Sequence, residues 1–327
     1  MRDFSYFRAD SIEAARSASA LPGAMLLAGG TTLVDLAKCG VAEPSAVVDI
    51  SHIEGLDAID VTPERAVIGA LARMSKVADH AEVKSRFPAV SEALWQAASA
   101  QLRNMATIGG NLMQRTRCPY FRDPQNFPAC NKRAPGSGCS AIGGVTRGHA
   151  VLGISEACIA TYPGDLAIAL VAFDAEVDLS GRKLKVEDFF LAPNATAERE
   201  HDIHPGEVIT AIEIPGSAAA RRSTYLKVRD RQSYEFAAAS AAVGLELEAD
   251  GRTVRDIRVA LGGVATKPWR ARAVEEALKG KQLSQDTVRK ASELAMEGAV
   301  DYGANHYKIA LAPRVIARAI LKLGETA

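Results

Sequence analysis

The sequence predicts an α+β protein with two domains, and three features of the chain lead to this expectation. Strand-like segments alternate with helical ones through the first two thirds, a small-residue linker lies at 216–220, and the remainder is typical of a hairpin followed by helices. We therefore expect a larger domain at 1–218 and a smaller domain, an antiparallel sheet with helices, at 219–327. A stretch at 112–160, rich in Arg, Pro, Gly and Cys, interrupts the first domain.

The first domain is expected to hold short strands around a helical region. Residues 75–106 are mainly helical in pattern, and the apolar run at 166–173 predicts a further helix. Strands are predicted by apolar or alternating runs at 24–28, 46–50, 66–70 and 206–215.

The second domain is expected to open with a β-hairpin. Runs of strand-like residues at 242–248 and 254–261 flank an Asp-Gly turn at 250–251, a dipeptide that favours tight hairpins. Helical patterns follow at 271–279, 284–300 and 313–323, and the last of these is predicted to begin at its proline.

Composition excludes some partners. The chain of 327 residues has 39 basic and 39 acidic side chains, so its formal net charge is zero. A balanced charge gives no electrostatic reason to expect a nucleic acid or an anionic membrane as partner. The longest apolar run is too short to cross a bilayer, and the first residues lack the apolar core of a secretory signal.

Cysteine usage is the first unusual feature. Four of the five cysteines lie between residues 118 and 158, and the fifth is Cys39 in a predicted short helix. Disulfides are rare in a reducing cytoplasm, so clustered cysteines there indicate metal binding or redox chemistry. A loop as long as 112–160 inside a compact domain also requires a functional or metal-binding reason. Cys39 is interpreted as an ordinary buried thiol.

Two glycine pairs, Gly29-Gly30 and Gly109-Gly110, each follow an apolar stretch. Glycine permits positive φ and a close approach of the backbone to a ligand, so successive N–H groups can face phosphate oxygens. Either pair alone is more often an ordinary turn. Neither has the spaced glycines of a nicotinamide-binding Rossmann turn.

Taken together, the motifs give the chain a family resemblance. It resembles the FAD subunits of the xanthine dehydrogenase and aldehyde oxidoreductase family, whose flavin domain has the PCMH-type fold of vanillyl-alcohol oxidase. The matching segments run in order along nearly the whole chain: Ala28-Gly29-Gly30-Thr31-Thr32-Leu33, Thr107-Ile108-Gly109-Gly110-Asn111, Tyr162-Pro163-Gly164-Asp165-Leu166-Ala167, Gly206-Glu207-Val208-Ile209, Lys227-Val228-Arg229 and Gly262-Gly263-Val264-Ala265-Thr266-Lys267-Pro268-Trp269-Arg270.

The resemblance implies an FAD site. The first turn would wrap the pyrophosphate, Thr107 and its glycines would add contacts, Asp165 would accept hydrogen bonds from flavin hydroxyls, and Lys227 would lie near the ring. The competing interpretations are a helix cap for Asp165 and a solvated strand residue for Lys227. The implied contact residues are Met25, Leu26, Leu27, Ala28, Gly29, Gly30, Thr31, Thr32, Leu33, Thr107, Gly110, Asn111, Asp165, Ile209 and Lys227.

The cysteine-bearing insertion, residues 112–160, separates two FAD motifs that are close together in most family members. Cysteine spacing alone is uninformative, since neither the close pairs of zinc sites nor a ferredoxin run occurs. The insertion resembles that of the family's FAD subunits with an additional iron–sulfur cluster, which implies a [4Fe–4S] cluster on Cys118, Cys130, Cys139 and Cys158. The surrounding basic residues would offset its charge: Arg115, Arg117, Lys132 and Arg133.

The resemblance implies an electron-transfer subunit. A molybdenum-cofactor subunit would oxidise an aldehyde, a subunit with two [2Fe–2S] clusters would relay electrons, and this chain would pass them through FAD to an external acceptor. No catalytic acid or base is expected here. We expect a periplasmic location through a signal-bearing partner, and otherwise a cytoplasmic one.

Two alternatives remain open. Within the family, the chain could be the flavin subunit of a hydroxybenzoyl-CoA reductase or a xanthine dehydrogenase. Outside it, the chain could be a flavin-free interaction protein whose loop is stapled by zinc.

Overall fold

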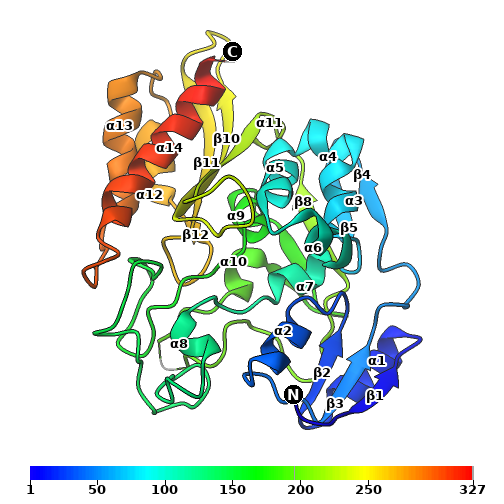
Figure 1. Ribbon diagram of the computed structural model, residues 1–327. Coiled ribbons are helices and arrows are strands. Elements are labelled where there is room, and N and C mark those ends of the chain that lie inside the picture. The colour runs from blue at the N-terminus through cyan, green and yellow to red at the C-terminus, as the bar shows by residue number, and fades with distance from the viewer. Residues whose placement is uncertain (195, 326–327) are drawn as a thin grey trace.

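The computed structural model describes residues 1–194 and 196–325. It contains three β-sheets, and Figure 1 shows how helices lie around them. The α+β fold class is confirmed, and so is the antiparallel sheet with helices in the second domain.

A small parallel sheet carries the N-terminus. Its strand order is β1-β3-β2, and the central strand pairs in parallel with both neighbours. Two short helices follow strands of this sheet. The elements are β1 (Ser5–Arg8), α1 (Ile12–Ser19), β2 (Ala24–Leu27), α2 (Leu33–Lys38) and β3 (Ala46–Asp49).

A five-stranded antiparallel sheet of order β4-β5-β8-β6-β7 forms the rest of the larger domain. Its strands are β4 (Ile59–Val61), β5 (Arg65–Gly69), β6 (Glu176–Asp178), β7 (Lys183–Lys185) and β8 (Ala211–Pro215). Its helices are α3 (Met74–Asp79), α4 (Ala81–Arg86), α5 (Pro88–Gln96), α6 (Ala100–Met105), α7 (Ile108–Leu112), α8 (Pro119–Arg122), α9 (Leu166–Ala172) and α10 (Val186–Phe189).

The second domain is a four-stranded antiparallel sheet of order β12-β11-β10-β9. The predicted hairpin corresponds to its two long central strands. The elements are α11 (Ala218–Arg221), β9 (Ser223–Val228), β10 (Ala239–Leu247), β11 (Val254–Gly262), β12 (Trp269–Arg270), α12 (Arg272–Leu278), α13 (Gln285–Glu293), the 3₁₀ turn η1 (Leu294–Met296) and α14 (Tyr307–Glu325).

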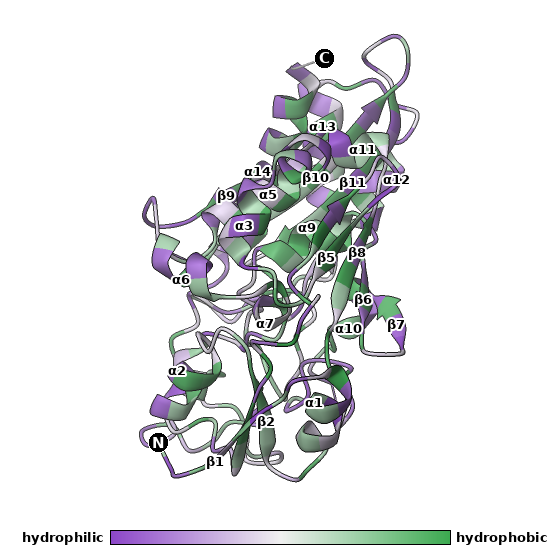
Figure 2. Ribbon diagram, turned by 90° about the vertical axis from the view of Figure 1, so that its right-hand side faces the viewer, coloured by the Kyte–Doolittle hydropathy of each residue, from purple (hydrophilic) through white to green (hydrophobic). Residues whose placement is uncertain are grey.

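Both faces of the second sheet are covered. Along β10, alternate residues such as Ala241 and Val243 join the core under α12, α13 and α14, while Ala242 joins the core of the larger domain. Helix α9 packs on that second face, and all its residues are buried. It is hydrophobic throughout (Figure 2). The two domains therefore share a continuous apolar boundary.

Three predicted boundaries were wrong. The helix expected at 284–300 ends earlier, since α13 stops at Glu293 and the 3₁₀ turn η1 at Met296. Helix α14 begins at Tyr307 and holds Pro313 inside it, because the buried residues Lys308 and Ala312 extend its packed face toward the N-terminus. A proline within a helix removes one backbone donor and its ring crowds the carbonyl four residues earlier, a cost that the buried face of α14 offsets. Strand β8 begins at Ala211 rather than at residue 206, since pairing with β5 and β6 starts there.

The cysteine-bearing insertion contains little regular structure. Its only helix in the described chain is α8, and it otherwise consists of turns with isolated bridges. Figure 1 shows it as green coils beneath the second domain. None of the helices in residues 1–194 and 196–325 combines the length and apolarity needed to span a bilayer.

Candidate functional site

The first glycine turn lies between β2 and α2. Gly30 has φ +72°, a conformation that favours glycine. Among the described residues, none accepts a hydrogen bond from the backbone amides of Gly29, Gly30, Thr31 or Thr32. The turn is half-buried rather than enclosed. Four successive unused donors are what a turn that binds phosphate oxygens offers.

The second glycine turn is closed on itself. Thr107 caps α7 by accepting a hydrogen bond from the Gly110 amide at 3.3 Å, and the Gly109 amide donates to the Ala70 carbonyl at 2.8 Å. The amides that were expected to contact a diphosphate therefore already donate hydrogen bonds to other groups of the protein. The Asn111 side-chain oxygen is different, because it is buried and has no hydrogen-bond partner in the described structure.

The two turns meet. A Cβ added to Gly29 would lie 2.1 Å from the Met105 carbonyl oxygen and 3.1 Å from the Cα of Ala106, just before the second turn. These are backbone atoms that cannot rotate away, so only glycine fits there. The geometry brings together the two segments that the sequence singled out separately.

Asp165 and Lys227 form a buried ion pair. The Lys227 ammonium lies 2.8 Å from the Asp165 carboxylate, and their side chains are 1% and 5% exposed. The Tyr225 hydroxyl also donates to Asp165 at 2.6 Å, and Lys227 donates to the Gln96 carbonyl at 3.1 Å. Burial raises the pKa of the Asp165 carboxyl, while Lys227 opposes the shift. Asp165 stands at the N-terminus of α9, but its side chain accepts no hydrogen bond from the amides of that helix.

Ile209 occupies a different environment. Its side chain is 6% exposed and belongs to the apolar core of the larger domain. The remaining predicted FAD contacts, Met25 to Leu27 and Leu33, lie at the ends of β2 and α2 that flank the first turn.

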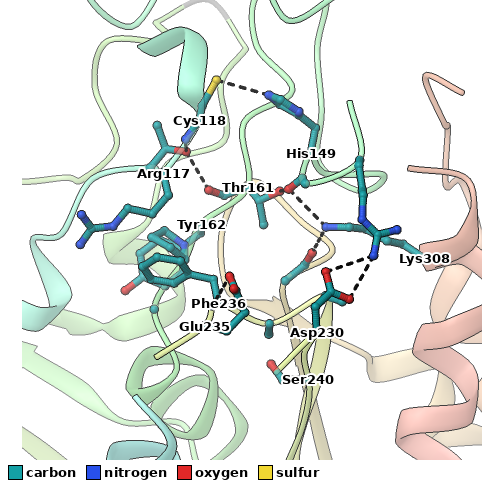
Figure 3. A pocket seen from close by; sticks show the side chains of 18 of the residues that line it. Arg117, Cys118, His149, Thr161, Tyr162, Asp230, Glu235, Phe236, Ser240 and Lys308 are labelled. Carbon is teal, nitrogen blue, oxygen red and sulfur yellow. Dashed lines mark hydrogen bonds and ion pairs between the residues drawn. The ribbon is translucent and has the colours of Figure 1, made fainter. Parts of the chain in front are cut away.

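A cavity of about 370 Å³ lies where the insertion faces the second domain. Its volume is within the range of small-molecule sites, about 300–1,000 Å³. Figure 3 shows polar side chains around it, drawn from three parts of the chain. Asp165 lines one part of the wall, and Cys118 and His149 line another.

Charged groups also border the cavity. Arg147 of the insertion forms two hydrogen bonds, of 3.0 and 3.1 Å, to Asp230 in the loop after β9. Lys308 is 1% exposed and donates to the carbonyls of Gly148 and Gly263. Burial lowers the pKa of Lys308 to about 8. Charged side chains of both signs, from both domains, therefore border the cavity.

All four cysteines of the insertion line one second, smaller cavity. Cys130 and Cys139 are paired by an isolated antiparallel bridge, and Cys158 forms a similar bridge with Ser155. Burial raises the pKa of the Cys118 thiol to about 12 and that of Cys158 to about 11. As free thiols they are therefore neutral, and binding a metal would require their deprotonation.

The donor set fits an iron–sulfur cluster, since such clusters are held by four cysteine thiolates. Within residues 1–194 and 196–325, no group of three or more His, Cys, Asp or Glu side chains is placed to hold a metal ion. A single zinc ion would need sulfurs about 3.8 Å apart, from a Zn–S bond of about 2.3 Å. A four-iron cluster holds its cysteine sulfurs farther apart because iron and sulfide lie between them.

The basic residues of the insertion have partners of their own. Lys132 lines the cysteine cavity, and its ammonium lies 2.8 Å from Glu200, which also pairs with Arg115. Burial favours a neutral Glu200, but Lys132 and Arg115 outweigh it and lower its pKa to about 2. Arg133 donates instead to backbone carbonyls. No pattern in the sequence points to Glu200, which lies outside the insertion.

Arg117 connects the insertion to the first glycine turn. Its guanidinium pairs with Asp35 of α2 at 3.2 Å and lies over the Phe236 ring at 5.2 Å. Arg122 also donates to Asp35. The insertion is therefore anchored on the helix that begins directly after that turn.

Comparison with known proteins identifies the family. Residues 2–217 match the FAD binding domain in molybdopterin dehydrogenase, and residues 224–323 match the CO dehydrogenase flavoprotein C-terminal domain. The chain belongs to the FAD-binding subunits of the molybdenum hydroxylase family. It is thus a subunit of an oxidoreductase complex.

Individual members of the family match nearly the whole chain. The aldehyde oxidoreductase FAD-binding subunit PaoB of Escherichia coli is 43% identical, with 97% of each chain covered. The glyceraldehyde dehydrogenase medium chain of Sulfolobus acidocaldarius is 30% identical, over 88% of this chain and 85% of its own length.

Solved structures agree in fold. Carbon monoxide dehydrogenase from Hydrogenophaga pseudoflava superposes with a TM-score of 0.75 at 26% identity, over 98% of this chain and 96% of the other. Quinoline 2-oxidoreductase from Pseudomonas putida 86 gives the same TM-score at 23% identity, over 100% and 98% of the two chains.

Proposed function

We propose that this chain is the FAD and [4Fe–4S] subunit of a molybdenum-dependent aldehyde oxidoreductase. In the complex it would receive electrons from a molybdenum-cofactor subunit and a subunit with two [2Fe–2S] clusters, and pass them through FAD to an external acceptor. The 43% identity to an aldehyde oxidoreductase FAD-binding subunit, over nearly the full length of both chains, supports the aldehyde as substrate class.

The observation that carries the FAD site is the convergence of the two glycine turns. Unused amides at 29–32 suit the diphosphate, and the unpartnered oxygen of Asn111 suits a hydroxyl of the cofactor. Asp165 would bind the part of FAD that lies nearer the large cavity, and the ion pair with Lys227 would keep the Asp165 carboxylate charged and oriented. Bound FAD supplies hydride and one-electron chemistry, and the protein's share is to bind and orient it.

The four cysteines would hold the cluster, with Lys132 close by to offset negative charge. Metal binding contributes free energy to folding, so the cluster would also hold together an insertion that has little regular structure. We propose a periplasmic location for the assembled complex. Detection of the complex in the cytoplasmic fraction alone would contradict that location.

Purification of the complex without oxygen tests the cofactors. We expect visible flavin absorption and, in this subunit, about four iron atoms that are lost in Cys130→Ser while flavin is retained. Cys39→Ser is the matched control, because Cys39 lies outside the cysteine cavity. Zinc in place of iron, or a colourless subunit, would contradict the proposal.

Substrate assays test the remaining part. The complex should reduce an artificial acceptor with aldehydes. Turnover of purines or aromatic acyl-CoA thioesters in place of aldehydes would assign the chain to a xanthine dehydrogenase or a hydroxybenzoyl-CoA reductase.

A further inference from the structure

Cys118 is the point at which the two cavities meet. Among the residues that the structure describes, it is the one that lines both the cysteine cavity and the large cavity. The other three cysteines line the smaller cavity alone. Asp165, the proposed flavin contact, lines the large cavity as well. Cys118 is therefore the cysteine on the side of the cluster site that faces the proposed flavin site.

His149 contacts the sulfur of Cys118. Its Nε2 lies 3.3 Å from the Cys118 Sγ (Figure 3), and the side chain is only 3% exposed. No other side chain among the described residues forms a hydrogen bond to any of the four sulfurs. Cys158 receives only a backbone contact, from the Ala160 amide at 3.4 Å.

The segment that carries His149 is held in place from the second domain. The Thr146 hydroxyl donates to the Tyr302 carbonyl at 2.7 Å, and the Asn305 amide donates to the Ala150 carbonyl at 2.9 Å. The backbone amide of His149 also donates to Thr146 at 2.8 Å. The imidazole is thus fixed against Cys118 by groups on both sides of it in the sequence.

We infer that His149 is a positioning residue for the four-cysteine centre, whose Nε2–H donates a hydrogen bond to the Cys118 sulfur and raises the centre's reduction potential. The inference rests on the proposed function, since it requires the cluster. A thiolate sulfur has no proton to offer, so the histidine must be the donor. Hydrogen bonds to cluster sulfurs favour the reduced form, which carries more negative charge.

With this hydrogen bond the centre would have more than a structural role. A cluster that only stabilises the fold needs no particular reduction potential. The hydrogen bond from His149, however, acts on Cys118, the proposed cluster ligand that also lines the large cavity. The reduction potential of the centre would therefore depend on the hydrogen bond from His149 to Cys118.

The test uses the whole complex with His149→Leu and His149→Gln. Iron content and the electron paramagnetic resonance signal of the centre are followed during a titration with dithionite. In His149→Leu we expect retained iron and a tenfold less favourable reduction equilibrium, which is about 59 mV for a one-electron couple. His149→Gln keeps an N–H donor and should restore most of the difference. His80→Leu, between α3 and α4, is the control and should match the native protein.

Each contrary outcome has a distinct meaning. An unchanged potential in His149→Leu with full iron would overturn the inference and leave the proposed function intact. An equal shift in the Gln and Leu variants would overturn it in favour of packing alone. Loss of iron in both variants would make the role structural. A native subunit without iron would overturn both the cluster and the inference.

Discussion

The ion pair between Asp165 and Lys227 predicts a large energetic effect of a single substitution. Lys227→Met removes the ammonium but preserves much of the side-chain volume, and leaves the carboxylate buried with the Tyr225 hydroxyl. At 2.8 Å and an effective dielectric constant of about 20, the attraction is about 6 kcal/mol. Removing one partner of a buried pair costs about 3–5 kcal/mol, and we expect the free energy of unfolding in urea to fall by that amount.

A double-mutant cycle separates the pair from its surroundings. Asp165→Asn leaves a buried ammonium and should also destabilise, whereas Asp165→Asn combined with Lys227→Met should cost less than the two single changes together. The reason is that the double variant buries no unpaired charge. A loss below about 1 kcal/mol in Lys227→Met, the value of an exposed pair, would refute the reasoning.

Three further predictions concern the turn, the insertion and pH. Gly29→Ala places a Cβ against the Met105 carbonyl, so the flavin content of the purified complex should fall several-fold, whereas Gly324→Ala should leave it unchanged. Removal of iron by a chelator should make the cysteine-bearing insertion more sensitive to protease while flavin stays bound; equal cleavage with and without iron would count against this. His201 donates to the Leu112 carbonyl, and burial lowers its pKa to about 4. Its folded pKa lies below the unfolded value of about 6.5, so its stabilisation of up to about 3 kcal/mol is present above pH 6.5 and lost as pH falls through 4. In His201→Gln, the free energy of unfolding in urea should change less between about pH 4 and pH 6.5. An unchanged dependence on pH would show that His201 is not its source.

The parts of the fold that the sequence predicts best are those with local signals. The Asp-Gly dipeptide between two strand-like runs predicts the hairpin of β10 and β11, and the uninterrupted apolar run predicts α9. The start of α14 differs from the prediction because proline is favoured at the first position of a helix, whereas here Pro313 lies inside a helix that begins at Tyr307. The start of β8 depends on its partner strands.

In the candidate site, too, features with local sequence motifs were predicted and features that depend on tertiary contacts were not. The glycine turns and the grouping of the cysteines follow from motifs, and the structure brings each set together. The mutual pairing of Asp165 and Lys227 joins residues 62 positions apart, and sequence spacing contains no information on such a contact. His149 and Glu200 were missed because a lone histidine or glutamate in a loop has no pattern around it.

Asp35 connects the segment of the proposed FAD site with the insertion that carries the proposed cluster. This carboxylate accepts hydrogen bonds from Arg117 and Arg122 near the start of the insertion, and it belongs to the helix that opens after the first glycine turn. Ordering either segment therefore restricts the other. If the chain binds both proposed groups, thermodynamic linkage requires that each group favours binding of the other to the same extent, so their incorporation would be coupled.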